Sequence, residues 1–174
     1  MKLPGRKLGK KDVLRACFFV LAMLGLKIIA EFVLPERKLM MEPTNYGCIP
    51  WTLYLSVGGK DKEVKFDRYD VVAFPARNMN PYIPDGAPIA KMVAGLPGDT
   101  VEVRDGNLYI NGVLLGDTAY GAKKLKQPKN HWDKRYVLGK DEIFVYGSEE
   151  RSYDSRYWGP YPKNLVSGRI TVLY

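Results

Sequence analysis

The sequence predicts a mainly β domain preceded by one N-terminal transmembrane helix. Three features support this: a basic start followed by an apolar run, short β-type segments beyond that run, and Asp-Gly and Asn-Gly pairs between such segments. The length of 174 residues suits one domain, because it is too short for two full cores. With 46% apolar and 12% aromatic residues, the chain is not expected to be disordered.

The basic charge is concentrated at the start of the chain. Residues 1–15 hold six basic groups and one acid, so they carry +5 of the formal net charge of +8. A basic cluster beside an apolar run favours the anionic inner face of a membrane over a nucleic acid. We therefore expect residues 1–12 to be a cytoplasmic N-terminus, inner-membrane lipids to be a partner, and nucleic acid not to be one.

Residues 13–34 are predicted to form a transmembrane anchor. Residues 16–26 carry no charge, and the whole stretch could cross about 30 Å of hydrocarbon as a helix. Lys27 and Glu31 lie four residues apart on one helical face, where they could pair or reach an interface. The alternatives are a cleaved secretory signal, although no convincing small-x-small site follows, and a buried amphipathic helix. The charge asymmetry favours a retained single-pass anchor in a bacterial inner membrane, with the rest of the chain in the periplasm.

Beyond the anchor, residues 35–174 are expected to form one β domain. Asp105-Gly106 and Asn111-Gly112 lie between alternating apolar runs and predict tight hairpin turns. The β-type runs predict roughly seven strands. Eight runs are candidates for these strands: 52–57, 70–74, 88–94, 100–103, 108–110, 113–115, 142–146 and 169–173.

Residues 120–140 interrupt these runs with a polar, basic insertion. Its basic side chains are Lys123, Lys124, Lys126, Lys129, Lys134 and Arg135. We expect a surface excursion between strands with solvated charges; a contact with substrate or membrane is the alternative. His131 lies in the same stretch and is better interpreted as a surface histidine than as the partner of a catalytic cysteine.

Lys91 is the first candidate for chemistry, because it lies within the apolar run 88–94. It could protect an edge strand, which is a common use of lysine. Alternatively, apolar neighbours could disfavour its ammonium form and leave a neutral amine to act as general base. Composition alone favours the edge-strand interpretation. Two cysteines and one histidine are too few for most zinc sites, and no cofactor is expected.

Two longer segments favour the interpretation of Lys91 as a general base, because they resemble boxes of the type I signal peptidase family. Residues 91–99, Lys-Met-Val-Ala-Gly-Leu-Pro-Gly-Asp, are similar to the box that the family's general-base lysine opens. Residues 147–162 are similar to its C-terminal box, with Asp-Ser-Arg-Tyr-Trp-Gly at 154–159, and residues 70–74 resemble the strand after the nucleophile region. The resemblance runs from about Pro43 to Tyr174 and implies a signal-peptidase-like β fold with a Ser–Lys dyad.

The nucleophile departs from the family pattern. Met40 takes the serine position when residues 40–45 are aligned with the family's Ser-Met-x-Pro-Thr-Leu, and a thioether has no proton to give. Residues 48–54 resemble the Ser-Met-Pro-x-Gly-Leu-Tyr region of the conjugative-transfer branch, with Cys48 in the serine position and Thr52 in place of glycine. We prefer the second alignment, because Tyr54 and the strand after it keep their register and Cys48 then lies just before the predicted strand 52–57. A Cys–Lys dyad is chemically reasonable, since a thiol gives its proton to a neutral amine more readily than a hydroxyl does.

The resemblance also implies roles for residues around this Cys48–Lys91 dyad. Ser152 matches the serine that hydrogen-bonds the lysine and aims its nitrogen, as catalytic support. The remaining carried-over positions are structural: the turn Pro97, Gly98 and Asp99, and the ion pair of Asp154 and Arg156.

The implied function is a membrane-anchored signal peptidase whose partner is a precursor with a signal sequence. The conjugative-transfer branch implies a pilin precursor, and the enzyme could also join the pilin's ends, since an amine as well as water can resolve an acyl-enzyme. The alternative is a catalytically inactive, membrane-tethered binding or assembly factor, which Met40 would favour. A self-cleaving repressor-type Ser–Lys protease is disfavoured, because no DNA-binding helix pair is present in the sequence.

Overall fold

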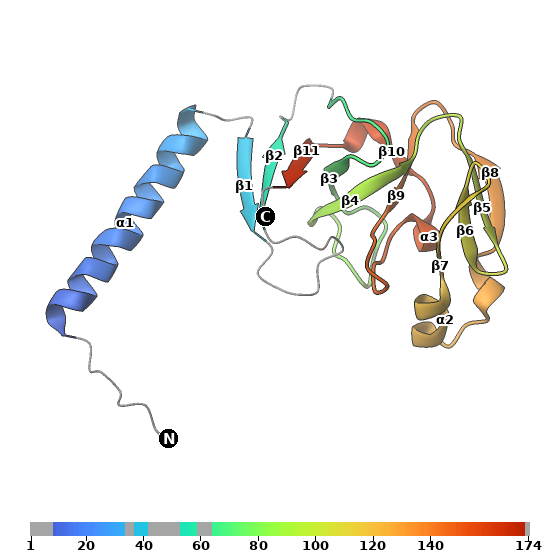
Figure 1. The fold of residues 1–174 in the computed structure, drawn as a ribbon, viewed down its shortest axis with the longest axis horizontal. Helices are drawn as coiled ribbons and strands as arrows, with labels where there is room; N and C mark the ends of the chain where they lie inside the picture. The colour runs from blue at the N-terminus through green and yellow to red at the C-terminus, as the bar shows by residue number, and fades with distance from the viewer. Residues whose placement is uncertain (1–8, 34–36, 42–52, 59–63, 173–174) are drawn as a thin grey trace, which may run out of the picture. The chain divides into compact units, whose positions relative to one another are not determined.

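The computed structural model describes residues 9–33, 37–41, 53–58 and 64–172 (Figure 1). The chain divides into two compact units, Met1–Arg37 and Lys38–Tyr174, and each is described by itself.

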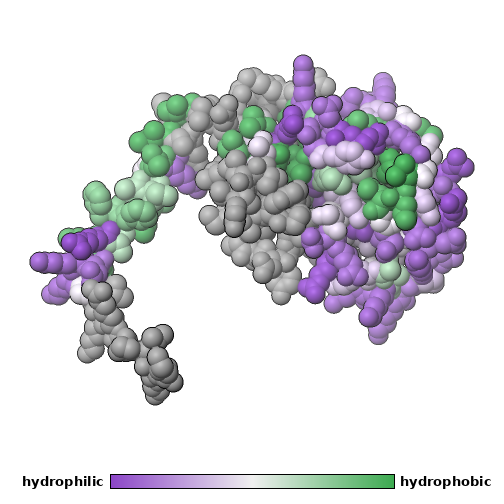
Figure 2. Space-filling view, viewed as in Figure 1, coloured by the Kyte–Doolittle hydropathy of each residue, from purple (hydrophilic) through white to green (hydrophobic). Residues whose placement is uncertain are grey.

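The first unit contains the helix α1 (Lys10–Val33). Its start is capped locally: the Gly9 carbonyl accepts from the N–H groups of Asp12 and Val13 at 2.9 and 3.1 Å, and the Asp12 carboxylate accepts from the Gly9 N–H at 3.2 Å. An acid in the first turn also complements the helix dipole. Apolar side chains cover much of the helix surface, and Phe18 is 73% exposed (Figure 2).

Most of the predicted membrane-spanning segment, residues 13–34, lies in this helix. A helix is present, but among the described residues none is long and apolar enough to cross a membrane.

The second unit is built from two antiparallel sheets. In the described part of the chain, a seven-stranded sheet has the order β1-β2-β11-β3-β4-β9-β10 and a four-stranded sheet has the order β7-β6-β5-β8 (Figure 1). The strands of the larger sheet are β1 (Arg37–Met41), β2 (Leu53–Val57), β3 (Val71–Pro75), β4 (Pro88–Gly95), β9 (Glu142–Tyr146), β10 (Tyr161–Pro162) and β11 (Gly168–Val172). Those of the smaller sheet are β5 (Thr100–Arg104), β6 (Asn107–Ile110), β7 (Val113–Asp117) and β8 (Lys134–Val137).

The hydrophobic core consists of two clusters that share strands β4 and β9. Because neighbouring residues in a strand face opposite sides, Val93 and Val145 belong to one cluster, whereas Ala94 and Phe144 belong to the other. The two strands pair directly, with Val93 opposite Val145. This pair of strands therefore connects the cores under the two sheets, and β4 also carries Lys91.

The predicted hairpins of the smaller sheet are confirmed. Asp105 and Gly106 connect β5 to β6 with φ values of 50° and 71°, and Asn111 and Gly112 connect β6 to β7 with 51° and 81°. Positive φ at both central residues is what a two-residue type I′ turn requires, and Asn, Asp and Gly tolerate it best.

The basic insertion 120–140 has more regular structure than a surface excursion. It contains the helix α2 (Ala119–Leu125), the 3-10 turn η1 (Lys129–Trp132) and the edge strand β8, which pairs with β5. The strand is hard to recognise in the sequence because its inward positions are Lys134 and Tyr136. The Lys134 amine lies 5.8 Å from the centre of the Tyr136 ring, and burial lowers the pKa of Lys134.

Candidate active site

Lys91 lies in the middle of β4, between β3 and β9, so it is not on an edge strand. Its register partner in β3 is Val72, and the neighbouring Val72 and Val93 are fully buried. Lys91 itself is only 1% exposed. The interpretation of Lys91 as an edge lysine that protects the sheet is therefore wrong.

The buried amine of Lys91 meets one hydroxyl. Its Nζ donates to Ser152 Oγ at 3.0 Å, and Ser152 is 3% exposed. The described residues offer Nζ no other hydrogen-bond or ion-pair partner. Ser152 lies in the loop after β9, where its N–H donates to the Glu149 carbonyl at 2.9 Å. Two residues that are 61 positions apart in sequence are thus brought into contact.

A buried ion pair holds the segment that follows Ser152. Asp154 and Arg156 are 0% and 3% exposed, and their two parallel contacts, Nε to Oδ1 and Nη2 to Oδ2, both measure 2.8 Å. The Asp154 carboxylate also accepts from the Gly147 N–H at 2.9 Å and caps the short helix α3 (Ser155–Trp158). Burial lowers the pKa of Arg156, but the hydrogen bond and charge of Asp154 outweigh it and raise that pKa overall.

The guanidinium of Arg156 also contacts the backbone of Ser152. Arg156 Nη2 donates to the Ser152 carbonyl at 3.3 Å, and Nη1 donates to the Asp117 carbonyl at 2.6 Å. Its carbon lies 4.6 Å from the centre of the Tyr146 ring. Arg156 thus connects the end of β7, the end of β9 and the backbone of Ser152.

The turn between β4 and β5 contains Pro97, Gly98 and Asp99. Pro97 and Gly98 are exposed, with Gly98 at a φ of 88°, whereas Asp99 is 8% exposed. The Asp99 carboxylate accepts from the Leu96 N–H at 2.6 Å, from the Asn111 amide at 2.7 Å and from Arg68 Nη2 at 2.9 Å. Burial raises the pKa of Asp99, but these hydrogen bonds outweigh it and hold the pKa below its ordinary value.

The proposed nucleophile lies outside the described residues. Cys48 falls in the range 42–52, so its distance from Lys91 is not part of the described geometry. Met40 lies in β1. Cys17 is an exposed free thiol in α1, and His131 is an exposed residue in η1 against the Trp132 ring. Among the described residues, no group of three or more His, Cys, Asp or Glu side chains could hold a metal ion.

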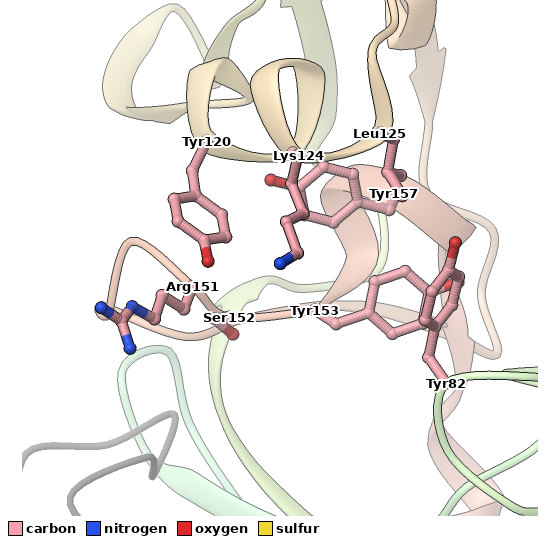
Figure 3. Close-up of a pocket in the computed structure, with 9 residues that line it drawn as sticks. Tyr82, Tyr120, Lys124, Leu125, Arg151, Ser152, Tyr153 and Tyr157 are labelled. Atoms are coloured by element: carbon pink, nitrogen blue, oxygen red, sulfur yellow. The ribbon is translucent and has the colours of Figure 1, made fainter.

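A cavity of about 300 Å³ opens beside Ser152 (Figure 3). It is lined by Tyr82, Tyr120, Gly121, Lys124, Leu125, Arg151, Ser152, Tyr153 and Tyr157. Sequence reasoning placed none of these tyrosines at the site and so missed this wall. Tyr153 could have been found from its place beside Ser152, but nothing in the sequence indicates that Tyr82 or Tyr120 lies near them.

Comparisons with known proteins place the chain in a family. The family described as "Signal peptidase, peptidase S26" matches residues 11–174. The chain is 37% identical over 90 residues to a probable signal peptidase I-2 of Synechocystis sp., covering 48% of this chain and 37% of that protein. It is 29% identical over 111 residues to a signal peptidase I of Leptolyngbya laminosa, covering 62% of this chain and 52% of that protein. The chain thus spans about half or less of the length of these two relatives.

Two further relatives match larger shares. A signal peptidase I of Bacillus caldolyticus is 28% identical over 167 residues, covering 89% of this chain and 84% of that protein. The solved structure of a signal peptidase I from Enterococcus faecalis V583 is 34% identical and covers 65% of this chain and all of that one, with a TM-score of 0.40. Because the family match extends over nearly the whole sequence, this chain belongs to the signal peptidase family, peptidase S26.

Proposed function

We propose that this chain is a signal peptidase I-like endopeptidase that removes signal sequences from precursor proteins, with Lys91 as its general base. The observation that carries the proposal is the contact of 3.0 Å between a buried lysine amine and a buried serine hydroxyl. A general base needs its lone pair aimed at the proton that it takes. The hydrogen bond from the Lys91 amine to the Ser152 hydroxyl fixes the orientation of that amine. Family membership independently favours the same chemistry.

Cys48 would be the nucleophile, in the position where the family has serine. The neutral Lys91 amine takes the proton of the Cys48 thiol, and the thiolate attacks the carbonyl carbon of the scissile peptide bond. The tetrahedral intermediate then collapses: its C–N bond breaks, the protonated Lys91 gives the proton to the leaving amine, and a thioester remains. Water, deprotonated by the same amine, hydrolyses the thioester and regenerates the thiol.

The substrate would be a conjugative pilin precursor, cleaved after a small residue at the end of its signal sequence. Support for this finer assignment comes from residues 48–54, which resemble the conjugative-transfer branch of the family. Joining the pilin's ends would need a second thioester, formed when Cys48 attacks a carbonyl near the pilin's C-terminus and a C-terminal segment leaves as the amine. The amine of the pilin's own N-terminus can then resolve that thioester. Mass spectrometry of the product distinguishes the two outcomes, because a cyclic pilin is one water lighter than the linear one.

Precursors of this kind would be met at the bacterial inner membrane. Exposed apolar side chains along α1, such as Phe18 and Leu21, and the basic Lys10, Lys11 and Arg15 at its start favour binding to an anionic lipid surface. We expect the full chain to sediment with vesicles that contain anionic lipid and to do so less at high salt. Equal sedimentation with uncharged vesicles would contradict the role of the basic groups.

The peptidase mechanism is tested by cleavage of a co-expressed pilin precursor. Lys91→Ala and Cys48→Ala should each reduce cleavage about 10²- to 10⁴-fold, the usual contribution of a base or nucleophile. Cys48→Ser should retain part of the activity. Cys17→Ala is the matched control, because it removes the other thiol, and it should cleave normally. Normal cleavage by all of the Cys48 and Lys91 variants would show that the dyad assignment is wrong.

A catalytically inactive assembly factor is the second candidate. The observation that favours it is Met40, which takes the serine position in the other alignment of the nucleophile box. Met40→Ser separates the two candidates. If the chain is inactive and this variant cleaves the precursor, Met40 and not Cys48 occupies the nucleophile position.

A further inference from the structure

The cavity beside Ser152 is formed by three segments that lie far apart in the sequence. Tyr82 comes from the loop between β3 and β4, Lys124 from α2, and Tyr153 from the segment that follows Ser152 (Figure 3). At about 300 Å³ it lies at the small end of ligand pockets, with room for one large side chain. Because Ser152 forms part of its wall and also bonds Lys91, whatever fills the cavity lies next to the proposed base.

The wall is aromatic and tightly supported. The Tyr82 and Tyr153 rings meet edge to face at 5.1 Å, and the Tyr153 and Tyr157 rings stack at 5.8 Å. Gly121 allows α2 to pack directly on Tyr157, because a Cβ at that position would overlap the ring. Burial raises the pKa of Tyr153 and of Tyr157, which favours the neutral form of both phenols. Such a surface favours an apolar or aromatic side chain through stacking.

The charge on the cavity wall is positive. Among the described residues, its lining includes Lys124 and Arg151 and no acidic residue. The Lys124 amine and the Tyr120 hydroxyl point from α2 toward the segment of Ser152, whereas the guanidinium of Arg151 turns away from Tyr153 (Figure 3). Lys124 has no hydrogen-bond or ion-pair partner among the described residues. A carboxylate is the group that would complement it.

We propose that this cavity is a substrate subsite that takes an aromatic side chain of the precursor close to the cleaved bond, with Lys124 pairing a carboxylate beside that side chain. The inference rests on the proposed peptidase function, since it is the contact of Ser152 with Lys91 that makes the cavity part of the active site. It adds a preference for a particular precursor sequence to that function.

The test uses peptides that bind without being cleaved, so that it does not depend on turnover. Precursor peptides with a reduced scissile bond carry Phe or Ser at each position around that bond, with Glu or Lys beside it, and their binding to the full wild-type chain is measured by fluorescence anisotropy. At one position, we expect Phe to bind about 5-fold more tightly than Ser. A neighbouring Glu should bind about 3- to 5-fold more tightly than Lys, as an exposed ion pair allows.

Matched variants locate these preferences in the cavity. Lys124→Glu should reverse the preference for Glu over Lys, whereas Lys123→Glu, on the same helix but outside the cavity lining, should leave it in place. Tyr82→Ser should remove the preference for Phe, whereas Tyr69→Ser should not, although both tyrosines are largely exposed. Both substituted tyrosines lie on the surface, so we expect both variants to fold and their peptide binding to be directly comparable.

The outcomes separate this inference from the function on which it rests. If no position shows the preferences, or if Lys123→Glu acts like Lys124→Glu, the subsite assignment is overturned even when precursor cleavage is normal. If the preferences appear and respond to Lys124→Glu and Tyr82→Ser, the subsite is supported. Failure of the wild-type chain to cleave any precursor would then count against the peptidase function alone.

Discussion

Asp154→Asn should be among the most destabilising conservative substitutions in the described part of the chain. The carboxylate is fully buried and accepts four hydrogen bonds: Oδ1 from the Arg156 N–H and Nε, and Oδ2 from Gly147 N–H and Arg156 Nη2. Asparagine keeps the size and one oxygen, but it replaces the other oxygen with a donor. Two of the four donors would then face an NH₂ group, and the guanidinium would lose its counter-charge.

The magnitude follows from these contacts. A buried donor left without an acceptor costs about 1–3 kcal/mol, and removal of one member of a buried ion pair costs about 3–5 kcal/mol. These overlap, because two of the contacts belong to the ion pair, so we expect Asp154→Asn to lower the free energy of unfolding by about 3–5 kcal/mol. Combining it with Arg156→Met removes the unpaired charge, so the double variant should lose less than the sum of the single losses.

Equilibrium urea unfolding of the full chain, followed by tryptophan fluorescence, measures the effect. The control is Glu102→Gln, which breaks an exposed ion pair with Arg104 at 3.2 Å and should leave stability unchanged within error. A loss below about 1 kcal/mol for Asp154→Asn would refute the reasoning. So would strict additivity in the double variant, since it would mean that Asp154 and Arg156 stabilise the fold independently.

Three further substitutions test other parts of the structure. Ser152→Ala should leave the Lys91 amine misdirected and lower kcat about 100-fold with little change in KM. Ser152→Thr keeps a hydroxyl and should recover activity. Equal kcat for the wild type and both variants would exclude a positioning role for Ser152. The hydrogen bonds of Asp99 lower its pKa in the folded state below the unfolded-state pKa of 3.8, so they stabilise the fold fully when the pH is above 3.8. This stabilisation is lost as the pH falls through the folded-state pKa. Urea unfolding should therefore show a larger loss for wild type than for Asp99→Asn between about pH 5 and about pH 3, and parallel losses would contradict it. Gly106→Ala should destabilise more than Gly112→Ala, because both have positive φ but only at Gly106 would a Cβ overlap neighbouring atoms; similar melting temperatures would speak against this.

Local chemistry made much of the β domain predictable. Asp-Gly and Asn-Gly turns between alternating apolar residues identify hairpins with few alternatives, and β5, β6 and β7 occur where those turns require them. The strands that were missed lack this signal. In β8 the inward positions are Lys134 and Tyr136, and β10 is only two residues long.

The candidate site was less accessible to local reasoning. Composition alone favoured the interpretation of Lys91 as an edge lysine, because a sequence does not show which strands pair on either side of it. Its position between β3 and β9 depends on contacts between distant segments. Only the resemblance of two boxes linked it with Ser152. Tyr82 and Tyr120 belong to neither box, so no sequence signal connected them with the site.

The contact between Lys91 and Ser152 depends on two independent constraints. The register of β4 against β9 places the amine, since the Met92–Tyr146 and Val93–Val145 pairs align the strand that carries it with the strand that precedes the serine loop. The ion pair between Asp154 and Arg156 places the hydroxyl, through the bond from Arg156 Nη2 to the Ser152 carbonyl. A weakened ion pair should therefore impair the proposed catalysis before it unfolds the sheet, since β4 and β9 remain paired by their own backbone hydrogen bonds.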